Sequence, residues 1–248
     1  MTQPNFHILH FDSLSSTNLE AAKRAAQGAP EGLVIVANEQ TAGRGRLGRH
    51  WVSPKGAGLY LSIVLRPQLG VDVWPLITFV AALAVHDALF QCCGLQTDIK
   101  WPNDVLANDR KLCGILAETF DVGSEGAIIL GIGVNLTSSS FPADLRETAT
   151  SVESLIGDIP DPESVLQSIL AAFQNRYSAL LKEGGREQVI SDWSQRSSFA
   201  FRKRIRVKNG DEMLEGITRG LERDGALRVE TDAGEIKIVR AGDVTVTH

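Results

Sequence analysis

The sequence has few cysteines, no excess of positive charge and no long apolar run, and each shortage excludes a class of protein. Only Cys92, Cys93 and Cys113 occur in 248 residues, without the spacing of a zinc site or the even number of a disulfide framework. The formal net charge is −5, whereas proteins that bind nucleic acid in bulk present a strongly basic face. The first residues lack the basic start and apolar core of a signal peptide. We therefore expect a cytoplasmic protein with reduced thiols.

The most apolar stretch, residues 74–90, is too interrupted for a membrane helix. It contains Pro75, His86 and Asp87, and a membrane span needs roughly 18 or more predominantly apolar residues. We predict a buried core helix over residues 73–91 instead, and no membrane contact. With 43% hydrophobic and 22% charged residues, the composition is ordinary for a globular protein.

Strand-like and helical patterns mix along the first 197 residues. Apolar β-branched runs bounded by turn residues predict strands, and apolar residues three and four apart predict helices. Thr17 followed by Glu20 fits a capping box at the start of a helix that ends before Gly28. A second amphipathic helix begins at Pro162 and is closed by Gly184. The expected strands lie near residues 6–11, 32–40 and 58–67, in three segments within 97–120, and at 127–137.

The pattern changes after Ser198. Turn signals at Asn209-Gly210, Asp224-Gly225 and Ala233-Gly234 separate short alternating strands, with no helical period between them. Such spacing is typical of a small β-barrel. We therefore expect two domains, residues 1–197 and 198–248.

Residues 41–51, TAGRGRLGRHW, contain a literal G-x-G-x-x-G pattern. A dinucleotide-binding fingerprint needs a helix directly after the glycines and an acidic residue about 20 positions later. Here Pro54 and Gly56 follow without a helical period, and the acidic residue is missing. A phosphate-binding loop of the G-x-x-x-x-G-K-[ST] type is absent from the whole chain. A Rossmann or Walker nucleotide site is therefore excluded.

What remains is a glycine-rich loop that carries Arg44, Arg46 and Arg49. Glycines let the backbone move and approach a ligand closely. Guanidinium groups offer paired donors to phosphate or carboxylate oxygens. The loop by itself indicates an anion-binding segment, and a solvated basic loop is the alternative.

Four other stretches place polar or small residues where a ligand would be bound. Ser15–Asn18 sets hydroxyl and amide groups at a helix start, and Gln40 ends a strand. Lys100 ends another strand beside Trp101, and the segment GIGVN sets two glycines inside an apolar strand. Glycines at such positions indicate close approach of a ligand or of another backbone. Each stretch alone also has an ordinary structural explanation.

Taken together, these stretches resemble the biotin protein ligases. The segments SSTN, QTAGRGRLGRHW, KWPNDV, KLCGILAE and GIGVNL occur in that family's order over about residues 7–137. The resemblance implies an α+β fold: a mixed β-sheet with flanking helices, similar to class II aminoacyl-tRNA synthetases and lipoate ligases. A small C-terminal barrel of the Src-homology-three type would follow. It also implies that biotin and ATP give biotinyl-5′-AMP, from which biotin passes to a lysine of a biotin carboxyl carrier domain.

The resemblance and the residue types together assign candidate site residues. Lys100 and Arg46 are the catalytic candidates. The biotin-binding candidates are Ser16, Thr17, Asn18, Gln40, Arg44, Gly45, Arg46, Lys100, Gly131 and Gly133. The candidates for binding ATP or the adenylate are Arg44, Arg46, Arg49, Trp51, Asn103 and Asn135. The metal ligands stay unassigned.

The chemistry of adenylation explains why positive charge is needed. The biotin carboxylate and the α-phosphate are both anions, so the site must place cations where the transition state develops charge. We expect Lys100 to bridge the two groups, the loop arginines to clamp phosphates, and Mg²⁺ to neutralise the leaving pyrophosphate. The loop would be mobile when empty and would close as a lid that excludes water from the adenylate.

Several details stay open. The flat rings of biotin would lie against Gly131 and Gly133. Trp51 would pack on the closed lid or serve as an ordinary core residue. Asn103 and Asp104 would hold the Lys100 turn, orient a metal ion or contact the acceptor amine.

Two other functions are alternatives to a biotin protein ligase. A lipoate ligase would use similar chemistry but would need a long apolar channel. A nucleic-acid-binding module would use the loop and the basic run at residues 201–208. Some family members carry an N-terminal helix-turn-helix domain, but only about a dozen residues precede SSTN here. We therefore expect no DNA binding, while a homodimer is possible.

Overall fold

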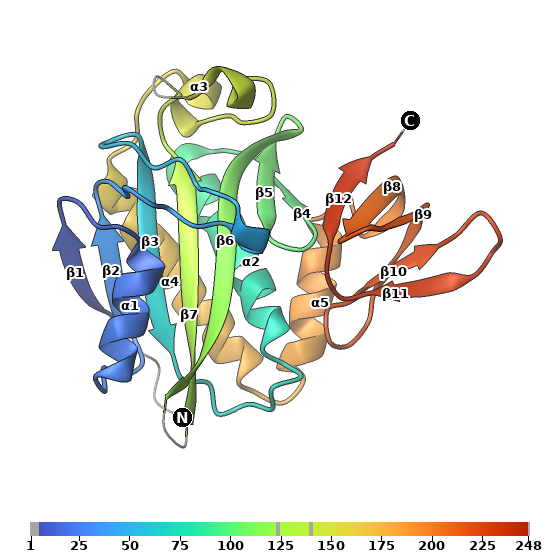
Figure 1. The fold of residues 1–248 in the computed structure, drawn as a ribbon, viewed down its shortest axis with the longest axis horizontal. Coiled ribbons are helices and arrows are strands. Elements are labelled where there is room, and N and C mark those ends of the chain that lie inside the picture. Colours follow the sequence, from blue (N-terminus) through green and yellow to red (C-terminus); the bar gives the residue numbers. More distant parts are fainter. Residues whose placement is uncertain (1–4, 123–124, 139–140, 248) are drawn as a thin grey trace.

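A seven-stranded mixed sheet forms the larger part of the protein (Figure 1). The computed structural model describes residues 5–122, 125–138 and 141–247. The strands lie in the order β1-β2-β3-β7-β6-β5-β4, in which β1 and β2 are parallel and all other pairs are antiparallel. The strand bounds are β1 His7–Phe11, β2 Leu33–Ala37, β3 Gly58–Leu65, β4 Asp98–Lys100, β5 Asp104–Ala107, β6 Arg110–Val122 and β7 Glu125–Asn135.

The pairing of β7 with both β3 and β6 brings three distant segments together. Gly133 of β7 lies opposite Tyr60 of β3 on one side and Gly114 of β6 on the other. Strand β6 is longer than its other neighbour β5, and the pairing of β5 with β6 ends at Gly114. The rest of β6, from Ile115 onward, is therefore not paired with β5 and lies next to the glycines of β7.

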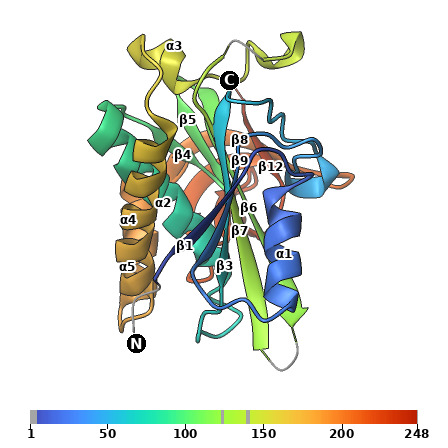
Figure 2. The same ribbon diagram turned by 90° about the vertical axis from the view of Figure 1, so that its left-hand side faces the viewer.

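Helices cover both faces of this sheet (Figure 2). Helix α1, Thr17–Ala26, packs on one face, and helices α2 and α4 pack on the other, with α5 on the same side against α2 and α4. The bounds on the second face are α2 Pro75–Cys93, α4 Pro162–Leu180 and α5 Gly185–Gln195, and the short helix α3 spans Val152–Ile156. Two 3₁₀ turns, Arg46–Gly48 and Ala143–Leu145, lie in the loops.

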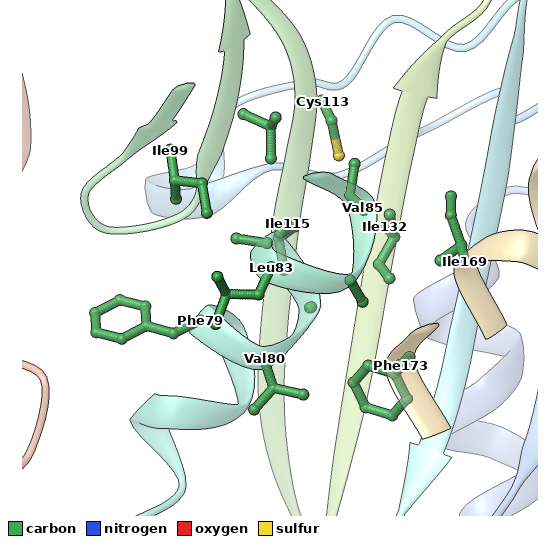
Figure 3. Packing of buried hydrophobic residues seen from close by; sticks show 14 of the residues in the cluster. Phe79, Val80, Leu83, Val85, Ile99, Cys113, Ile115, Ile132, Ile169 and Phe173 are labelled. Carbon is green, nitrogen blue, oxygen red and sulfur yellow. The ribbon is translucent and has the colours of Figure 1, made fainter. Parts of the chain in front are cut away.

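Helix α2 is the centre of the hydrophobic core (Figure 3). Among the described helices it alone is long and apolar enough to cross a membrane by length and composition, yet 61% of its most apolar window is buried inside the protein. Val80, Leu83 and Val85 are fully buried. A helix that is apolar on all sides is expected in such a core. The predicted core helix is confirmed.

The predicted capping box at the start of α1 is wrong. The N-cap residue is Ser16, and no side chain caps the helix. The Thr17 hydroxyl donates to Gln40 Oε1 instead, and Glu20 forms an ion pair with Arg24. Tertiary contacts have taken over both side chains that local sequence assigned to capping.

The second predicted helix ends before the glycine that was expected to close it. Helix α4 stops at Leu180, with Leu181 as its C-cap, and Gly184 adopts the left-handed conformation (φ 75°) as the N-cap of α5. Only glycine adopts that conformation without steric cost. The separate helix α5 was not anticipated from the sequence.

The C-terminal residues form a five-stranded antiparallel sheet in the order β11-β10-β9-β8-β12. The strands are β8 Phe201–Asn209, β9 Glu212–Leu221, β10 Leu227–Glu230, β11 Ile236–Val239 and β12 Asp243–Val246. In the described pairings β11 and β12 are edge strands, so hydrogen bonds do not close this sheet into a barrel. Trp101 Nε1 donates to Gly225 O at 3.0 Å and joins this sheet to the larger one.

Candidate functional site

Two adjoining cavities contain all the residues singled out from the sequence. The smaller, about 110 Å³, lies where the start of α1, the 41–51 loop and strands β6 and β7 meet. Its predicted lining residues are Ser16, Thr17, Asn18, Gln40, Arg44, Gly45, Arg46, Arg49, Trp51, Asn103, Gly131 and Gly133. The larger, about 710 Å³, extends toward the C-terminal sheet. Its predicted lining residues are Arg49, Trp51, Lys100 and Asn135.

The hydroxyl and amide groups at one end of the smaller cavity form a connected network. Gln40 Oε1 accepts from the backbone N of Thr17 at 2.8 Å and from its hydroxyl at 3.1 Å. Gln40 Nε2 donates to Ser53 Oγ at 2.9 Å. The start of α1 and the end of β2 are thereby held together, so the cluster is pre-formed before any ligand arrives.

Ser62 extends this network to Asn18. Its hydroxyl lies 2.8 Å from Thr17 Oγ1 and 2.6 Å from Asn18 Oδ1. A hydroxyl carries one hydrogen, so Ser62 donates to only one of these oxygens at a time. The amide oxygens of Gln40 and Asn18 each have two lone pairs and are the acceptors that this cluster offers to an N–H group.

The two glycines of β7 make room for protein side chains. A Cβ at Gly131 would lie 2.3 Å from Asn18 Oδ1, and one at Gly133 would lie 2.5 Å from Trp51 Nε1. The Asn18 amide and the Trp51 indole therefore occupy the space over Gly131 and Gly133 in which we expected the rings of biotin to lie. Trp51 also covers Gly114, and its Nε1 is buried without a hydrogen-bond partner among the described residues.

Each arginine of the loop is anchored to a different part of the protein. Arg44 forms an ion pair with Glu118 of β6 at 2.8 Å. Arg46 Nη1 donates to Asn103 Oδ1 at 2.9 Å. Arg49 forms an ion pair with Asp243 of β12. The loop therefore connects strand β6, the Pro102 turn and the C-terminal sheet.

Arg46 is the most enclosed of the three arginines. Burial lowers its pKa, while the charges of Asp243 and Asp104 act in the opposite direction. A guanidinium pKa lies so far above neutrality that the group stays charged. Arg46 therefore keeps its positive charge inside the cavity, where screening by water is weak.

Lys100 lies in the larger cavity but does not line the smaller one. Its Nζ has no hydrogen bond or ion pair with any residue the structure describes, and burial lowers its pKa, while the charge of Asp104 acts in the opposite direction. An ammonium group left unpaired in a partly buried site is available to an anionic ligand. Lys100 is thus separated from the hydroxyl–amide cluster, which lines the smaller cavity.

Lys111 lies between the two cavities and was not singled out from the sequence. It lines both of them, its Nζ is 2.7 Å from Asp104 Oδ1, and it sits 5.3 Å from the centroid of the Trp51 ring. Its position just after the Asn108-Asp109 turn, at the start of a strand, was the available signal. Glu118, which holds Arg44, was also missed.

Asn103 has a clear structural role. Its Oδ1 accepts from Arg46, and its Nδ2 donates to Ile115 O at 2.8 Å. It therefore ties the Pro102 turn to both the loop and β6. Asn135 Nδ2 donates to Thr150 O at 3.0 Å and Lys111 O at 3.3 Å, so it supports the wall of the larger cavity.

Two arginines of the basic run in β8 are paired with carboxylates. Arg204 forms an ion pair with Asp232, and Arg206 forms one with Glu215. Lys203 lies over the ring of Phe199 and lines the larger cavity. Two of its arginines are therefore already neutralised, which weakens the case for a nucleic-acid-binding strand.

Comparison with known proteins identifies the family. Residues 10–135 match the biotin/lipoate A/B protein ligase family, and residues 203–246 match the biotin protein ligase C terminal domain. The biotin–[acetyl-CoA-carboxylase] ligase of Paracoccus denitrificans is 39% identical over 92% of this chain and 96% of its own. The bifunctional ligase/repressor BirA of Bacillus subtilis is 37% identical over 95% of this chain and 73% of its own.

Solved structures agree in fold. The biotin protein ligase of Aquifex aeolicus in complex with biotin and ATP is similar with a TM-score of 0.83 and 26% identity, over 97% of this chain and 98% of that one. The Leishmania major biotin protein ligase with biotinyl-5-AMP gives a TM-score of 0.65 and 26% identity, over 96% and 99%. Both sheets thus belong to one known architecture, and the chain is a member of the biotin/lipoate A/B protein ligase family.

Proposed function

We propose that the protein activates biotin with ATP to biotinyl-5′-AMP and then transfers the biotinyl group to a lysine of a biotin carboxyl carrier domain. The observation that carries this proposal is the meeting, around two adjoining cavities, of a neutral hydroxyl–amide cluster and a set of cations. The first suits the ureido group of biotin, which has one carbonyl and two N–H donors. The second suits a carboxylate and a chain of phosphates.

Biotin binds with its ureido group against Ser16, Thr17, Asn18 and Gln40. Its carboxylate then points toward Lys111 and the loop arginines, where the two cavities meet. ATP lies in the larger cavity with its phosphates near Arg49 and Lys100. The neutral end of biotin then lies against the hydroxyl and amide side chains, and its anionic end lies against the cationic side chains.

In the first step the carboxylate oxygen attacks the α-phosphorus and pyrophosphate leaves. No general base is needed because the carboxylate is already ionised near neutral pH. The protein must instead hold two anions together, and fixed cations do this at little reorganisation cost. Lys100 and Lys111 flank the meeting point from the two cavities, and Arg46 remains charged beside it.

Mg²⁺ fits this site as a companion of the nucleotide. No group of three or more His, Cys, Asp or Glu side chains able to hold a metal ion occurs in the described part of the chain. Mg²⁺ is commonly held by one or two carboxylates together with substrate phosphates and water. Asp104 is the carboxylate that would take this place, and the ion would neutralise charge on the leaving pyrophosphate.

In the second step the neutral amine of the carrier lysine attacks the activated carbonyl and AMP leaves. The mixed anhydride must be protected from water until the carrier arrives. The loop does this by spanning the cavity from β6 to the C-terminal sheet, with Trp51 as its apolar cover. We place the reaction in the cytoplasm; a homodimer is compatible with the proposal.

A direct test follows the fate of each substrate. Biotin-dependent exchange of labelled pyrophosphate into ATP should be seen with MgATP, and mass spectrometry should detect biotinyl-AMP retained by the protein. Lipoate offered in place of biotin should support little exchange, because the hydroxyl–amide cluster has no match on its dithiolane ring. Exchange that depends on lipoate and not on biotin would overturn the assignment of substrate.

A further inference from the structure

Glu118 uses its two carboxylate oxygens for two different parts of the site. Oε1 lies 2.8 Å from the guanidinium of Arg44 in the loop. Oε2 accepts from Asn18 Nδ2, also at 2.8 Å. The Glu118 side chain is 20% exposed, so both contacts are partly shielded from water. One carboxylate thus holds a residue of the loop and a residue of the cavity wall.

The contact with Asn18 fixes the orientation of an amide. A carboxylate only accepts hydrogen bonds, so the NH₂ end of Asn18 must face Glu118. The same NH₂ group lies 3.4 Å from Leu116 O, and the carbonyl end accepts from Ser62. Asn18 is 4% exposed. Its Oδ1 is thereby held over Gly131, facing the network of hydroxyls that receives the ligand.

The contact with Arg44 fixes one end of the loop. Within the described residues Glu118 is the one ion-pair partner of Arg44, whose side chain is 42% exposed. The neighbouring residues Gly43 and Gly45 give the loop backbone little stiffness of its own. The ion pair is therefore what attaches this end of the loop to strand β6.

We propose that Glu118 is a positioning residue for the ligase reaction, which couples the ligand-binding amide of Asn18 to closure of the loop through Arg44. The proposal rests on the proposed function. A ligand that hydrogen-bonds to Asn18 further restricts this amide, and with it the Glu118 carboxylate. The carboxylate then presents a fixed oxygen to Arg44, and the loop closes with less loss of side-chain freedom.

Three replacements separate this coupling from a simple stabilising role. Glu118→Gln has one carbonyl oxygen and no charge, so it can still accept from Asn18 but no longer pairs with Arg44. Glu118→Ala loses both contacts. Glu215→Gln is the matched control, because it removes a carboxylate that pairs with Arg206 in the C-terminal sheet.

Calorimetric titration with biotin and limited digestion with trypsin give the readouts. Hydrogen bonds to charged groups contribute enough that removing one changes an equilibrium by on the order of 10-fold. We expect Glu118→Gln to bind biotin about 10-fold more weakly and to lose most of the protection that biotin gives against cleavage at the loop arginines. Glu215→Gln should match the wild-type protein in both measurements.

A double-mutant cycle with Arg44→Met decides whether the two residues act together. Coupling requires that Glu118→Gln add little to the affinity already lost in Arg44→Met. Additive losses, or a biotin affinity of Glu118→Gln within twofold of wild type, would overturn the proposal. A loss of affinity that simply follows a lowered unfolding temperature would also overturn it.

The same set of proteins distinguishes failure of the inference from failure of the proposed function. If the wild-type protein shows no biotin-dependent pyrophosphate exchange, the ligase assignment is wrong. If the wild type is active and biotin protects its loop, but Glu118→Gln behaves identically, only the role of Glu118 is wrong. Should Glu118→Ala not fold, Glu118→Gln and the cycle with Arg44 still give the answer.

Discussion

Lys100 and Lys111 differ in what surrounds their ammonium groups, and this difference decides how each responds to substitution. Lys111 is paired with Asp104 and lies over the Trp51 ring. Lys100 has no partner among the described residues and is disfavoured as a cation by burial. An unpaired buried charge destabilises a protein unless a ligand compensates it. We therefore expect an anionic ligand to compensate the charge of Lys100.

Replacing Lys100 with Ala should reduce adenylation by on the order of 10²–10³, the usual effect of losing one pre-organised electrostatic group. Biotin affinity should fall much less, because Lys100 lies outside the smaller cavity. The measurement is pyrophosphate exchange beside calorimetric titration with biotin. The same experiment on Lys111→Ala should weaken both quantities. Near-normal exchange by Lys100→Ala would remove this lysine from the mechanism.

The lowered pKa of Lys100 has a consequence for pH dependence. As pH rises through the lowered pKa, Lys100 loses its proton and its charge earlier than an ordinary lysine would. Adenylation should therefore decline on the alkaline side, and Lys100→Arg should move that decline to higher pH because arginine stays charged. The test is the pH profile of pyrophosphate exchange for both proteins. Superimposable alkaline limbs would show that another group sets the profile.

Stability should change in the opposite sense at the same residue. The folded state binds this proton less readily than the unfolded chain, so stability rises with pH between the folded and unfolded pKa values of Lys100. Lys100→Met removes the unfavourable cation and should raise the unfolding temperature at neutral pH, with a smaller gain at high pH. Thermal scans at several pH values check this. An unfolding temperature below that of wild type at every pH would contradict it.

At this scale the sequence predicts residues whose chemistry is unusual for their surroundings. Three arginines among glycines, and hydroxyls next to an amide, are visible without a structure. Lys111 and Glu118 are not, because an isolated lysine or glutamate on a strand is ordinary. Their importance comes from Trp51, Asp104 and Asn18, which lie far from them in the chain.

At the scale of elements, the 41–51 loop is the segment that we expect to control access to the proposed site. It contains an isolated antiparallel bridge between Arg44 and His50 and, inside it, a short 3₁₀ turn in which Leu47 has a positive φ of 55° and is 68% exposed. Its start is held by backbone hydrogen bonds from Thr41 N to Leu14 O and from Ala42 N to Ser15 O, and at its end Trp51 packs over Gly114 and Gly133. Between these ends the 3₁₀ turn buries no side chain, so we expect this tip of the loop to open at little cost in free energy.

Replacing Arg46 with Gly should loosen this lid. The change removes the hydrogen bond to Asn103 and adds backbone freedom. Biotinyl-AMP should still form but should dissociate faster, so that lysines of bystander proteins become biotinylated. Rapid dilution of the loaded enzyme, followed by detection of the retained adenylate, measures the release. Retention equal to that of wild type would mean that Arg46 does not hold the loop.

At the level of elements, periodic apolar patterns were reliable and end signals were not. The core helix was predicted because a helix that is apolar on all sides is stable in water only when it is buried. The capping box failed because Thr17 binds Gln40, a contact that depends on the fold. The separate helix α5 was missed because its apolar face is short, with Val189 and Trp193 as its large buried residues.

The two sheets of the molecule meet next to the cavities. Arg49 pairs with Asp243, and Arg46 Nη1 lies 3.5 Å from Gly242 O, its second contact after Asn103. Lys203 and Val246 of the C-terminal sheet line the larger cavity. The sequence predicted a change of architecture near residue 197 from its turn signals. It could not predict that the loop would touch β12, because the pairing of two distant segments follows from packing.

We expect this contact between the loop and β12 to make the two proposed substrate sites dependent on each other. If biotin orders the loop at the Arg44 end, then Arg49 and Asp243 at the other end are also held in place, and the wall of the larger cavity is completed. Biotin should then tighten the binding of a non-hydrolysable ATP analogue. Linkage requires the analogue to tighten biotin by the same factor, typically about 5- to 150-fold for couplings of this kind.

Two calorimetric titrations measure this coupling: the analogue into free protein, and the analogue into biotin-saturated protein. Asp243→Asn should reduce the ratio of the two affinities, because it weakens the ion pair that connects the loop to β12 while leaving the hydroxyl–amide cluster intact. Glu215→Gln, remote from the loop, should leave the ratio unchanged. Equal affinities in free and biotin-saturated wild-type protein would mean that the loop is already closed without ligand, and that its arginines act as a static phosphate clamp.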